Sequence, residues 1–385
     1  MKKVLKVFKW IGICLVSIVV LALVVRFVGQ RINSTTPKNG INEQMYIDVN
    51  GQQQWISIYG EDKNNPAMLY LHGGPGYSTS YADWVEMRKL AKDYTVICWD
   101  QRNSGKTLLK DPKDEPITPE MMRSDIEFVV DSMLERLGKE KITLLGMSWG
   151  TFYGCDYALN HPNKVECIIN LSQCVDEREG LLAVKRELLK RTEGNEADHE
   201  LAQKYEPTLL YDLDKDLMDA FNSLSTAEPE ERAAILENNP ELKEVMEKLR
   251  SQTEIVMTVV SKYMPDDESV FDADYNVIAA VYFCPYYSLS ELYKISKSED
   301  VSGFTIDDQQ EFYSQFSLLN RTKYEMPFYV LQGKNDDNDG LVKNYMEKVT
   351  APDKDMQYIE GGHMSTMLQS EQMAKFVHDI AEKSK

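Results

Sequence analysis

The chain has 385 residues, of which 43% are hydrophobic, and a formal net charge of -19. This is enough for one large globular domain or two, and the negative charge argues against nucleic acid as a partner. The six cysteines show no C-x-x-C spacing and the five histidines form no H-E-x-x-H motif. Neither a disulfide framework nor a metal site is therefore predicted, and no cofactor is implied.

The N-terminal segment predicts a membrane helix. Four lysines within the first nine residues precede the uncharged stretch Trp10–Val25. Such a segment is either a cleaved signal peptide or a membrane anchor. No small-residue cleavage pattern follows, which favours an uncleaved single-pass anchor in the cell membrane, lengthened by snorkelling of Arg26. The lysines predict a cytoplasmic N-terminus, with the rest of the chain outside. Polar residues 31–44 predict a linker.

Three apolar segments predict the first strands of a sheet. Gln54–Tyr59 alternates like a half-buried strand, and Ala67–Leu71 is a continuous apolar run typical of a buried one. The glycine-rich box His72-Gly73-Gly74-Pro75-Gly76 follows it directly. Tyr94–Trp99 is the third strand, and Asp100-Gln101-Arg102 comes after it. We interpret Arg102 as a structural clamp behind the glycine-rich loop.

The pentapeptide Gly146-Met147-Ser148-Trp149-Gly150 follows the predicted strand Ile142–Leu145. Thr151–Gly154 can open a helix after it. A serine on such a strand-to-helix turn is held on a sharp, exposed elbow, where neighbouring side chains would collide with the backbone. Ser148 is therefore the predicted nucleophile.

The next segments predict a parallel sheet interrupted by a helical insertion. A helix over Pro119–Leu137 and a strand over Val165–Leu171 continue the alternation of strands and helices. No clear strand follows until Pro327–Gln332 and Met356–Ile359. Amphipathic helices are predicted over residues 180–191, 215–224, 229–237 and 240–252. An insertion of this kind in such a fold forms a lid.

Two further motifs follow the late strands. Gly333-Lys334-Asn335-Asp336 offers an acid, with Asp337 and Asp339 as close competitors, and Gly361-Gly362-His363 offers a base. The order Ser…Asp…His predicts an α/β-hydrolase fold with a catalytic triad.

The His72–Gly76 box, Asp100-Gln101-Arg102 and the pentapeptide around Ser148 resemble the proline iminopeptidase group of serine α/β-hydrolases. The resemblance covers roughly residues 45–176 and 326 to the C-terminus. The family usually has a glycine where Asn103 stands. The resemblance implies that Asp336 is the acid that orients His363.

The resemblance also implies where substrate is held. The oxyanion hole would use the backbone N–H groups of Gly74 and Trp149. The family takes carboxylates for the substrate's amino group from its lid, and Glu177, Glu179 and Glu187 are the candidates here. Late in the lid, Tyr286 and Tyr287 either line an apolar substrate pocket or hold the lid together.

The predicted organisation is an anchor (1–30), a linker (31–44), a first core part (45–177), a helical lid (178–325) and a second core part (326–385). The predicted function is a membrane-anchored serine hydrolase that removes proline or another N-terminal residue from short peptides. An esterase or amide hydrolase acting on small apolar molecules is the alternative, because the same triad serves both. A third interpretation is a non-enzymatic binding protein with the hydrolase fold, but the presence of all three predicted triad residues disfavours it.

Overall fold

A computed structural model describes residues 2–264, 276–297 and 309–383. Its centre is an eight-stranded sheet in the order β1-β2-β4-β3-β5-β6-β7-β8. The strands are β1 (Ile41–Val49), β2 (Gln52–Gly60), β3 (Ala67–Leu71), β4 (Thr95–Asp100), β5 (Ile142–Met147), β6 (Val165–Leu171), β7 (Phe328–Gly333) and β8 (Lys354–Ile359). The strands from β4 to β8 in that order run parallel, and β2 is antiparallel to both of its neighbours.

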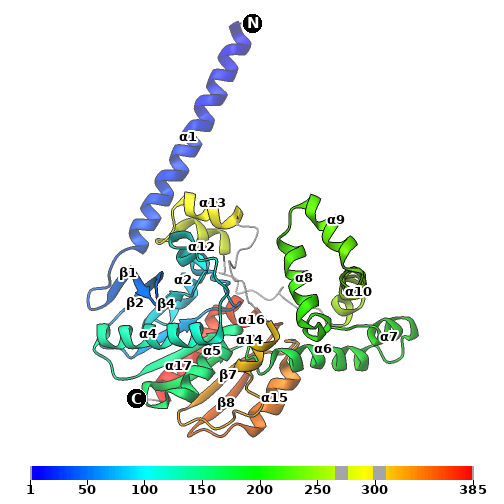
Figure 1. Cartoon of the computed structure of the whole chain (residues 1–385). Coiled ribbons are helices and arrows are strands. Elements are labelled where there is room, and N and C mark those ends of the chain that lie inside the picture. The colour runs from blue at the N-terminus through cyan, green and yellow to red at the C-terminus, as the bar shows by residue number, and fades with distance from the viewer. Residues whose placement is uncertain (1, 265–275, 298–308, 384–385) are drawn as a thin grey trace.

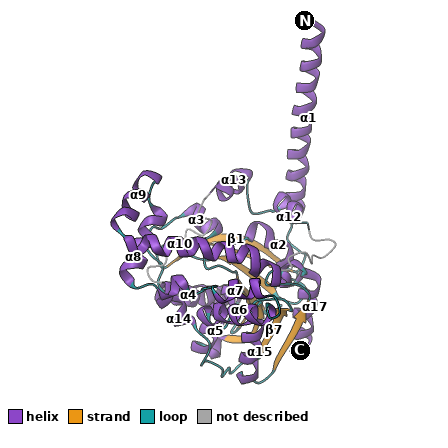
Figure 2. Cartoon of the chain, turned by 90° about the vertical axis from the view of Figure 1, so that its right-hand side faces the viewer, coloured by secondary structure: helices purple, strands orange, loops and turns teal. Residues whose placement is uncertain are grey.

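Helices enclose both faces of this sheet (Figure 2). Helices α4 (Pro119–Leu137), α5 (Trp149–Asn160) and α15 (Asp339–Lys348) bury their apolar residues on one face, and α2 (Ser80–Lys89) and α17 (Ser370–Lys383) on the other. Within β3, Leu69 and Leu71 join the first cluster while Met68 and Tyr70 join the second. A strand covered on both faces has no polar side, which explains its continuous apolar run.

The predicted strands are present, and two of them, β3 and β6, have the predicted bounds. β1 was not predicted. Its sequence mixes polar and apolar residues, and its side chains are mostly half-buried because it is an edge strand paired only with β2. Helix α1 (Lys2–Asn33) runs beyond residue 30 and β1 begins at Ile41, so the connecting segment is shorter than the predicted linker 31–44.

Helix α1 projects away from the rest of the protein (Figure 1). Its part Lys6–Asn33 is long and apolar enough to cross a membrane, and an 18-residue stretch within it has a mean hydropathy of 2.9. A signal sequence meets the same criteria of length and composition. Arg26 differs from the expectation of a snorkelling side chain. It is 4% exposed because it lies against the lid segment near Tyr282.

The insertion consists of helices joined by loops, and its described residues contain no strand of the sheet. Its helices are α6 (Glu177–Arg191), α7 (Glu196–Gln203), α8 (Lys215–Thr226), α9 (Pro229–Asn238), α10 (Pro240–Ile255), α11 (Ser261–Tyr263), α12 (Val277–Phe283), α13 (Leu289–Lys297) and α14 (Gln309–Phe316). The four predicted helical segments fall within α6, α8, α9 and α10. Helices α8 to α10 stand apart from the sheet (Figure 1), whereas α12, α13 and α14 pack back onto the core.

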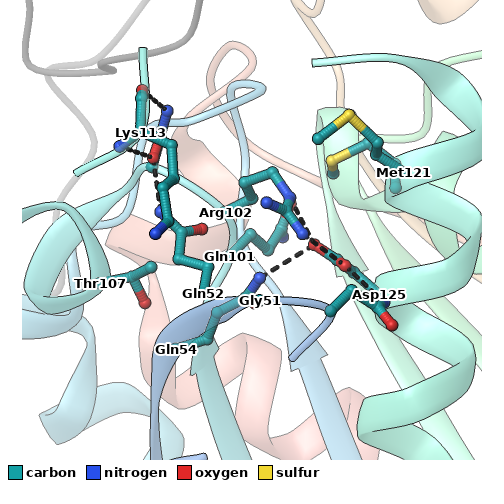
Figure 3. Close-up of polar contacts among 12 residues, drawn as sticks. Gly51, Gln52, Gln54, Gln101, Arg102, Thr107, Lys113, Met121 and Asp125 are labelled. Carbon is teal, nitrogen blue, oxygen red and sulfur yellow. Dashed lines mark hydrogen bonds and ion pairs between the residues drawn. The ribbon is translucent and has the colours of Figure 1, made fainter. Parts of the chain in front are cut away.

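Arg102 is held in the structural clamp that the sequence predicted (Figure 3). Its guanidinium donates to both carboxylate oxygens of Asp125 on α4, at 2.8 and 2.9 Å, and both side chains are buried. Gln54 donates to the same carboxylate at 2.9 Å. Next to the clamp, Asn103 has a φ of 51°, a conformation in which glycine and asparagine are the favoured residues. This explains why asparagine can stand where the family usually has glycine.

We expect Asp125→Ala to lower the free energy of unfolding by about 3–5 kcal/mol, because Arg102 would stay buried without its counter-charge. Urea denaturation of the full chain in detergent measures this. Asp131→Ala on the same helix is the matched control. Asp131 pairs with Lys164 at 2.6 Å but its side chain is 51% exposed, so a loss below about 1 kcal/mol is expected. Equal losses in the two variants would contradict the role of the clamp.

Candidate active site

Ser148 connects β5 to α5 in a backbone conformation that most residues avoid. Its φ is 53° and its ψ is -118°. A Cβ atom on Gly146 would lie 2.6 Å from the carbonyl oxygen of Gly150, and one on Gly150 would lie 2.0 Å from that of Leu71. Neither space admits a side chain. Both glycines are therefore required by the close approach of strand, turn and helix.

The structure brings Ser148, His363 and Asp336 together. Nε2 of His363 lies 2.8 Å from Oγ of Ser148, and Nδ1 lies 2.8 Å from Oδ2 of Asp336. With the Nδ1–H donating to the carboxylate, Nε2 can accept the serine proton. Both distances are within ordinary hydrogen-bond range. The arrangement has the geometry of a nucleophile, a base and an orienting acid.

Of the three candidate acids, Asp336 contacts the histidine ring. Its side chain is fully buried, and its second oxygen, Oδ1, accepts a hydrogen bond from the backbone N–H of Asn338 at 2.9 Å. Asp337 is exposed, and Asp339 is the first residue of α15. Asp336 is the acid that the family resemblance implies, and its catalytic role stays a prediction.

The loop that carries His363 is fixed from two sides. The hydroxyl of Ser172, a residue with a φ of 51°, donates to the carbonyl oxygen of His363. A Cβ on Gly333 would lie 2.2 Å from the carbonyl oxygen of Gly362, so the loops after β7 and β8 touch. The glycines of both motifs therefore allow the acid loop and the base loop to meet.

His72 in the glycine-rich box is not a second base. Its Nδ1 lies 2.7 Å from the carbonyl oxygen of Gly73, and the backbone N–H of Gln101 donates to its Nε2 at 3.2 Å. Burial lowers the pKa of His72 to about 4. The ring is therefore neutral at physiological pH and links the glycine-rich loop to the segment clamped by Arg102.

The glycine-rich loop lies over the nucleophile. A Cβ on Gly73 would be 3.5 Å from Cβ of Ser148, and Gly74 has a φ of 126°, which side chains rarely tolerate. Trp149 is the first residue of α5, where backbone N–H groups have no partner within the helix. These positions suit the predicted oxyanion hole of Gly74 and Trp149, whose function stays a prediction.

Ser148 lines a cavity of about 450 Å³ between the glycine-rich loop, α2 and α16 (Ser365–Leu368). Much of its wall is apolar, with Met147, Met364, Met367 and Leu368 among its lining residues. Two acidic side chains, Asp83 and Glu86 of α2, also line it. The cavity therefore combines an apolar wall with negative charge.

Asp83 and Glu86 were missed by the sequence analysis. Oδ2 of Asp83 accepts hydrogen bonds from the hydroxyls of Thr79 at 2.5 Å and Tyr70 at 3.2 Å. Burial, with a smaller contribution from the charge of Asp100, raises the pKa of Asp83 to about 6. The sequence could have indicated them because two acids lie three residues apart in the segment after the glycine-rich box. This spacing places both side chains on one side of a helix.

The three predicted lid carboxylates are placed differently. Glu177 begins α6, and burial raises its pKa, while a hydrogen bond from Tyr211 and the charge of His363 act in the opposite direction. It therefore lies within electrostatic reach of the triad. Glu179 and Glu187 are 39% and 37% exposed. They pair at the surface with Arg186 and Arg191, respectively.

Tyr286 and Tyr287 are packed against the core. Both rings contact Trp55 edge-on, with centroids 5.3 and 6.5 Å away. The hydroxyl of Tyr287 lies 2.8 Å from Oγ of Ser80 and donates to Asp100 at 3.2 Å. Neither tyrosine lines the cavity at Ser148. Their placement favours the alternative in which they hold this part of the lid in place.

Comparisons with known proteins agree with the geometry. A family model described as the alpha/beta hydrolase fold matches residues 66–203. A crystal structure of proline iminopeptidase from Mycobacterium smegmatis superposes with a TM-score of 0.52 at 16% identity, over 89% of this chain and all of that one. The chain has an α/β-hydrolase fold.

Among curated protein sequences, the chain is similar to aminopeptidases. The α/β-hydrolase chain is 33% identical to a proline iminopeptidase of Heyndrickxia coagulans over 132 residues, 34% of this chain and 43% of that protein. It is 29% identical to the Bacillus subtilis (strain 168) protein named "Probable aminopeptidase YbaC" over 144 residues, 37% of this chain and 45% of that protein. The matches thus span less than half the length of these relatives.

Proposed function

We propose that this α/β-hydrolase is a membrane-anchored serine aminopeptidase that releases proline or another residue from the N-terminus of short peptides. The observation that carries the proposal is the hydrogen-bonded chain from Ser148 through His363 to Asp336, with 2.8 Å at each step. The similarity to proline iminopeptidases supports the choice of substrate class. The apolar part of α1 supports the anchor.

In the proposed reaction, Oγ of Ser148 attacks the carbonyl carbon of the N-terminal residue as its proton passes to Nε2 of His363. Asp336 stabilises the imidazolium that forms. The N–H groups of Gly74 and Trp149 hold the oxyanion of the tetrahedral intermediate. His363 then protonates the leaving amine, and water enters to hydrolyse the acyl-enzyme with His363 again as the base.

The substrate's ammonium group needs a carboxylate close to the nucleophile. Asp83 lines the cavity with Ser148, and the hydroxyls of Tyr70 and Thr79 both donate to its Oδ2, so we assign the ligand to Oδ1. Glu177 offers a second carboxylate from the lid, near His363. We propose Asp83 as the main contact of the ammonium group and Glu177 as the closing contact from the lid.

The test is a pair of matched substrates, Pro- or Ala-arylamides with a free and with an acetylated amine. Acetylation removes the charge and leaves the carboxylate unpaired, which costs on the order of a hundredfold in kcat/KM. Asp83→Asn should lower kcat/KM for the free amine by a similar factor and spare a short acyl ester. Glu179→Gln is the matched control on the outer face and should change neither rate.

Stability gives an independent readout on the same variant. Asp83 ionises near pH 3.8 when unfolded and near pH 6 when folded, so its contribution to stability falls as pH rises between these values and stays low above them. Asp83→Asn should therefore raise the melting temperature at pH 7.5 relative to the parent. A variant that melts lower and loses activity on esters as well would show that Asp83 has a structural role only.

The apolar cavity wall favours an esterase or amide hydrolase as a second candidate. This enzyme would use the same triad with no need for a free amine. If acetylated and free substrates are cleaved alike while butyrate esters are cleaved faster than both, the aminopeptidase proposal fails and the esterase takes its place.

A further inference from the structure

Three polar side chains on α1 hold the end of α12. Arg26, Gln30 and Asn33 lie four and three residues apart, so they share one side of the helix. They donate to C=O groups in the last turn of α12, which have no partner within the helix, and to C=O groups in the residues that follow α12. The bonds run from Arg26 to Val281, Tyr282 and Tyr287, from Gln30 to Cys284 and Tyr287, and from Asn33 to Phe283.

This contact is close and buried. Arg26 is 4% exposed, although most of α1 is exposed. A Cβ on Gly29 would lie 2.2 Å from the ring of Phe283, so a glycine is needed where the helices touch. The hydroxyl of Tyr282 donates to the carbonyl oxygen of Ala22, inside the uncharged part of α1. The contact between α1 and α12 therefore lies where the uncharged stretch ends. Figure 1 shows α12 near the end of α1 that joins the rest of the protein.

The other end of α12 borders the catalytic cavity. Val277, its first residue, lines the cavity together with Ser148. Three large lining residues are also exposed, and all three carry apolar side chains or rings: Val277 is 45% exposed, Tyr77 50% and Met364 39%. The rim of the cavity, defined by Val277, Tyr77 and Met364, is therefore apolar and open. Ile278, the residue after Val277 on α12, is 79% exposed and is not one of the residues that line the cavity.

The two ends of α12 are close together. At about 1.5 Å per residue, its seven residues span about 10 Å. The polar headgroup layer of a bilayer is of similar size, about 5–8 Å on each side. If α1 crosses the membrane, the rim of the cavity lies at or just above the headgroups. Isolated exposed apolar residues are ordinary on a protein surface. An apolar rim held beside a membrane helix, in contrast, would face the surface of the bilayer.

We propose that the catalytic cavity opens at the membrane surface and that the enzyme acts on amphiphilic substrates held there, with an apolar chain in the bilayer and the scissile bond at headgroup level. This rests on the proposed function, since it takes α1 as an anchor and Ser148 as the nucleophile. The acidic cavity lining at Asp83 and the apolar wall would then receive the amine and the apolar body of one molecule.

The position of the rim is tested without activity. The full chain carrying Cys14→Ser and Ile278→Cys is labelled with bimane and placed in phosphatidylcholine vesicles containing lipids with a headgroup-proximal spin label. Quenching severalfold stronger than for a Phe128→Cys control is expected. Phe128 is 42% exposed on α4, away from α12. Equal quenching at the two positions would overturn the proposal, whatever the enzyme cleaves.

Substrate choice is tested with two arylamides that share one scissile bond, one soluble and one bearing a hexadecyl chain. In vesicles that hold both enzyme and substrate, the anchored compound should be cleaved about tenfold faster, because confinement raises its effective concentration. Ile278→Asp should remove most of that advantage and leave the soluble rate unchanged, while Phe128→Asp changes neither. No advantage for the anchored compound, or equal effects of both variants, overturns the proposal. A parent enzyme that does not cleave the soluble arylamide counts against the proposed aminopeptidase.

Discussion

Ser148→Ala is expected to reduce kcat by about 10⁴–10⁶-fold on every substrate that the parent cleaves. The members of a triad act as a unit, so removing the nucleophile costs nearly as much as removing all three. The remaining rate over water would come from the oxyanion hole and from binding. Steady-state hydrolysis of arylamide and ester substrates measures the loss.

The fold should survive this change, because the side chain of Ser148 stands at the cavity rather than in the core. A melting temperature within a few degrees of the parent is the control for folding. Ser314→Ala is the matched control for the chemistry, since Ser314 is exposed on α14 and its hydroxyl donates to the carbonyl oxygen of Glu311 in the same helix. A Ser148→Ala protein with near-parental turnover would place the nucleophile elsewhere.

Local patterns predicted the parts of the molecule that depend on local chemistry. β3 is apolar on both faces because helices cover both, and its bounds follow directly from that run. The pentapeptide around Ser148 needs its glycines because Gly146 and Gly150 touch neighbouring backbone. In each case the residue types are set by what lies within a few residues or by a tight turn, so the sequence alone carries the signal.

Features set by contacts between distant segments were not predicted. Asp83 becomes part of the cavity only because α2 lies beside the glycine-rich loop, and two acids three residues apart on a helix do not by themselves indicate a pocket. Arg26 looked like a membrane-flanking charge, yet its partners are C=O groups about 255 residues later. β1 has a sequence typical of a half-exposed edge, and its pairing with β2 determines its structure.

Asp336→Asn is expected to lower kcat by about 10⁴-fold while leaving the fold intact. Oδ2 of Asp336 accepts the Nδ1–H of His363, and an amide at this place favours the wrong tautomer and cannot stabilise the imidazolium. The loss of kcat in Asp336→Asn should exceed the loss caused by removing most single hydrogen bonds, because the substitution prevents His363 from acting as a base.

Asp337→Asn is the matched control one residue away. Asp337 is exposed, and its neutralisation should change kcat by less than about threefold, since an exposed charge is well screened by solvent. The measurement is kcat on one arylamide for both variants and the parent, with circular dichroism to confirm folding. Small and equal losses in the two variants would mean that the orienting acid lies outside the loop after β7. A large loss in Asp336→Asn alone would assign that role to Asp336, and the buried environment of its carboxylate would be the reason that the neighbouring acids cannot replace it.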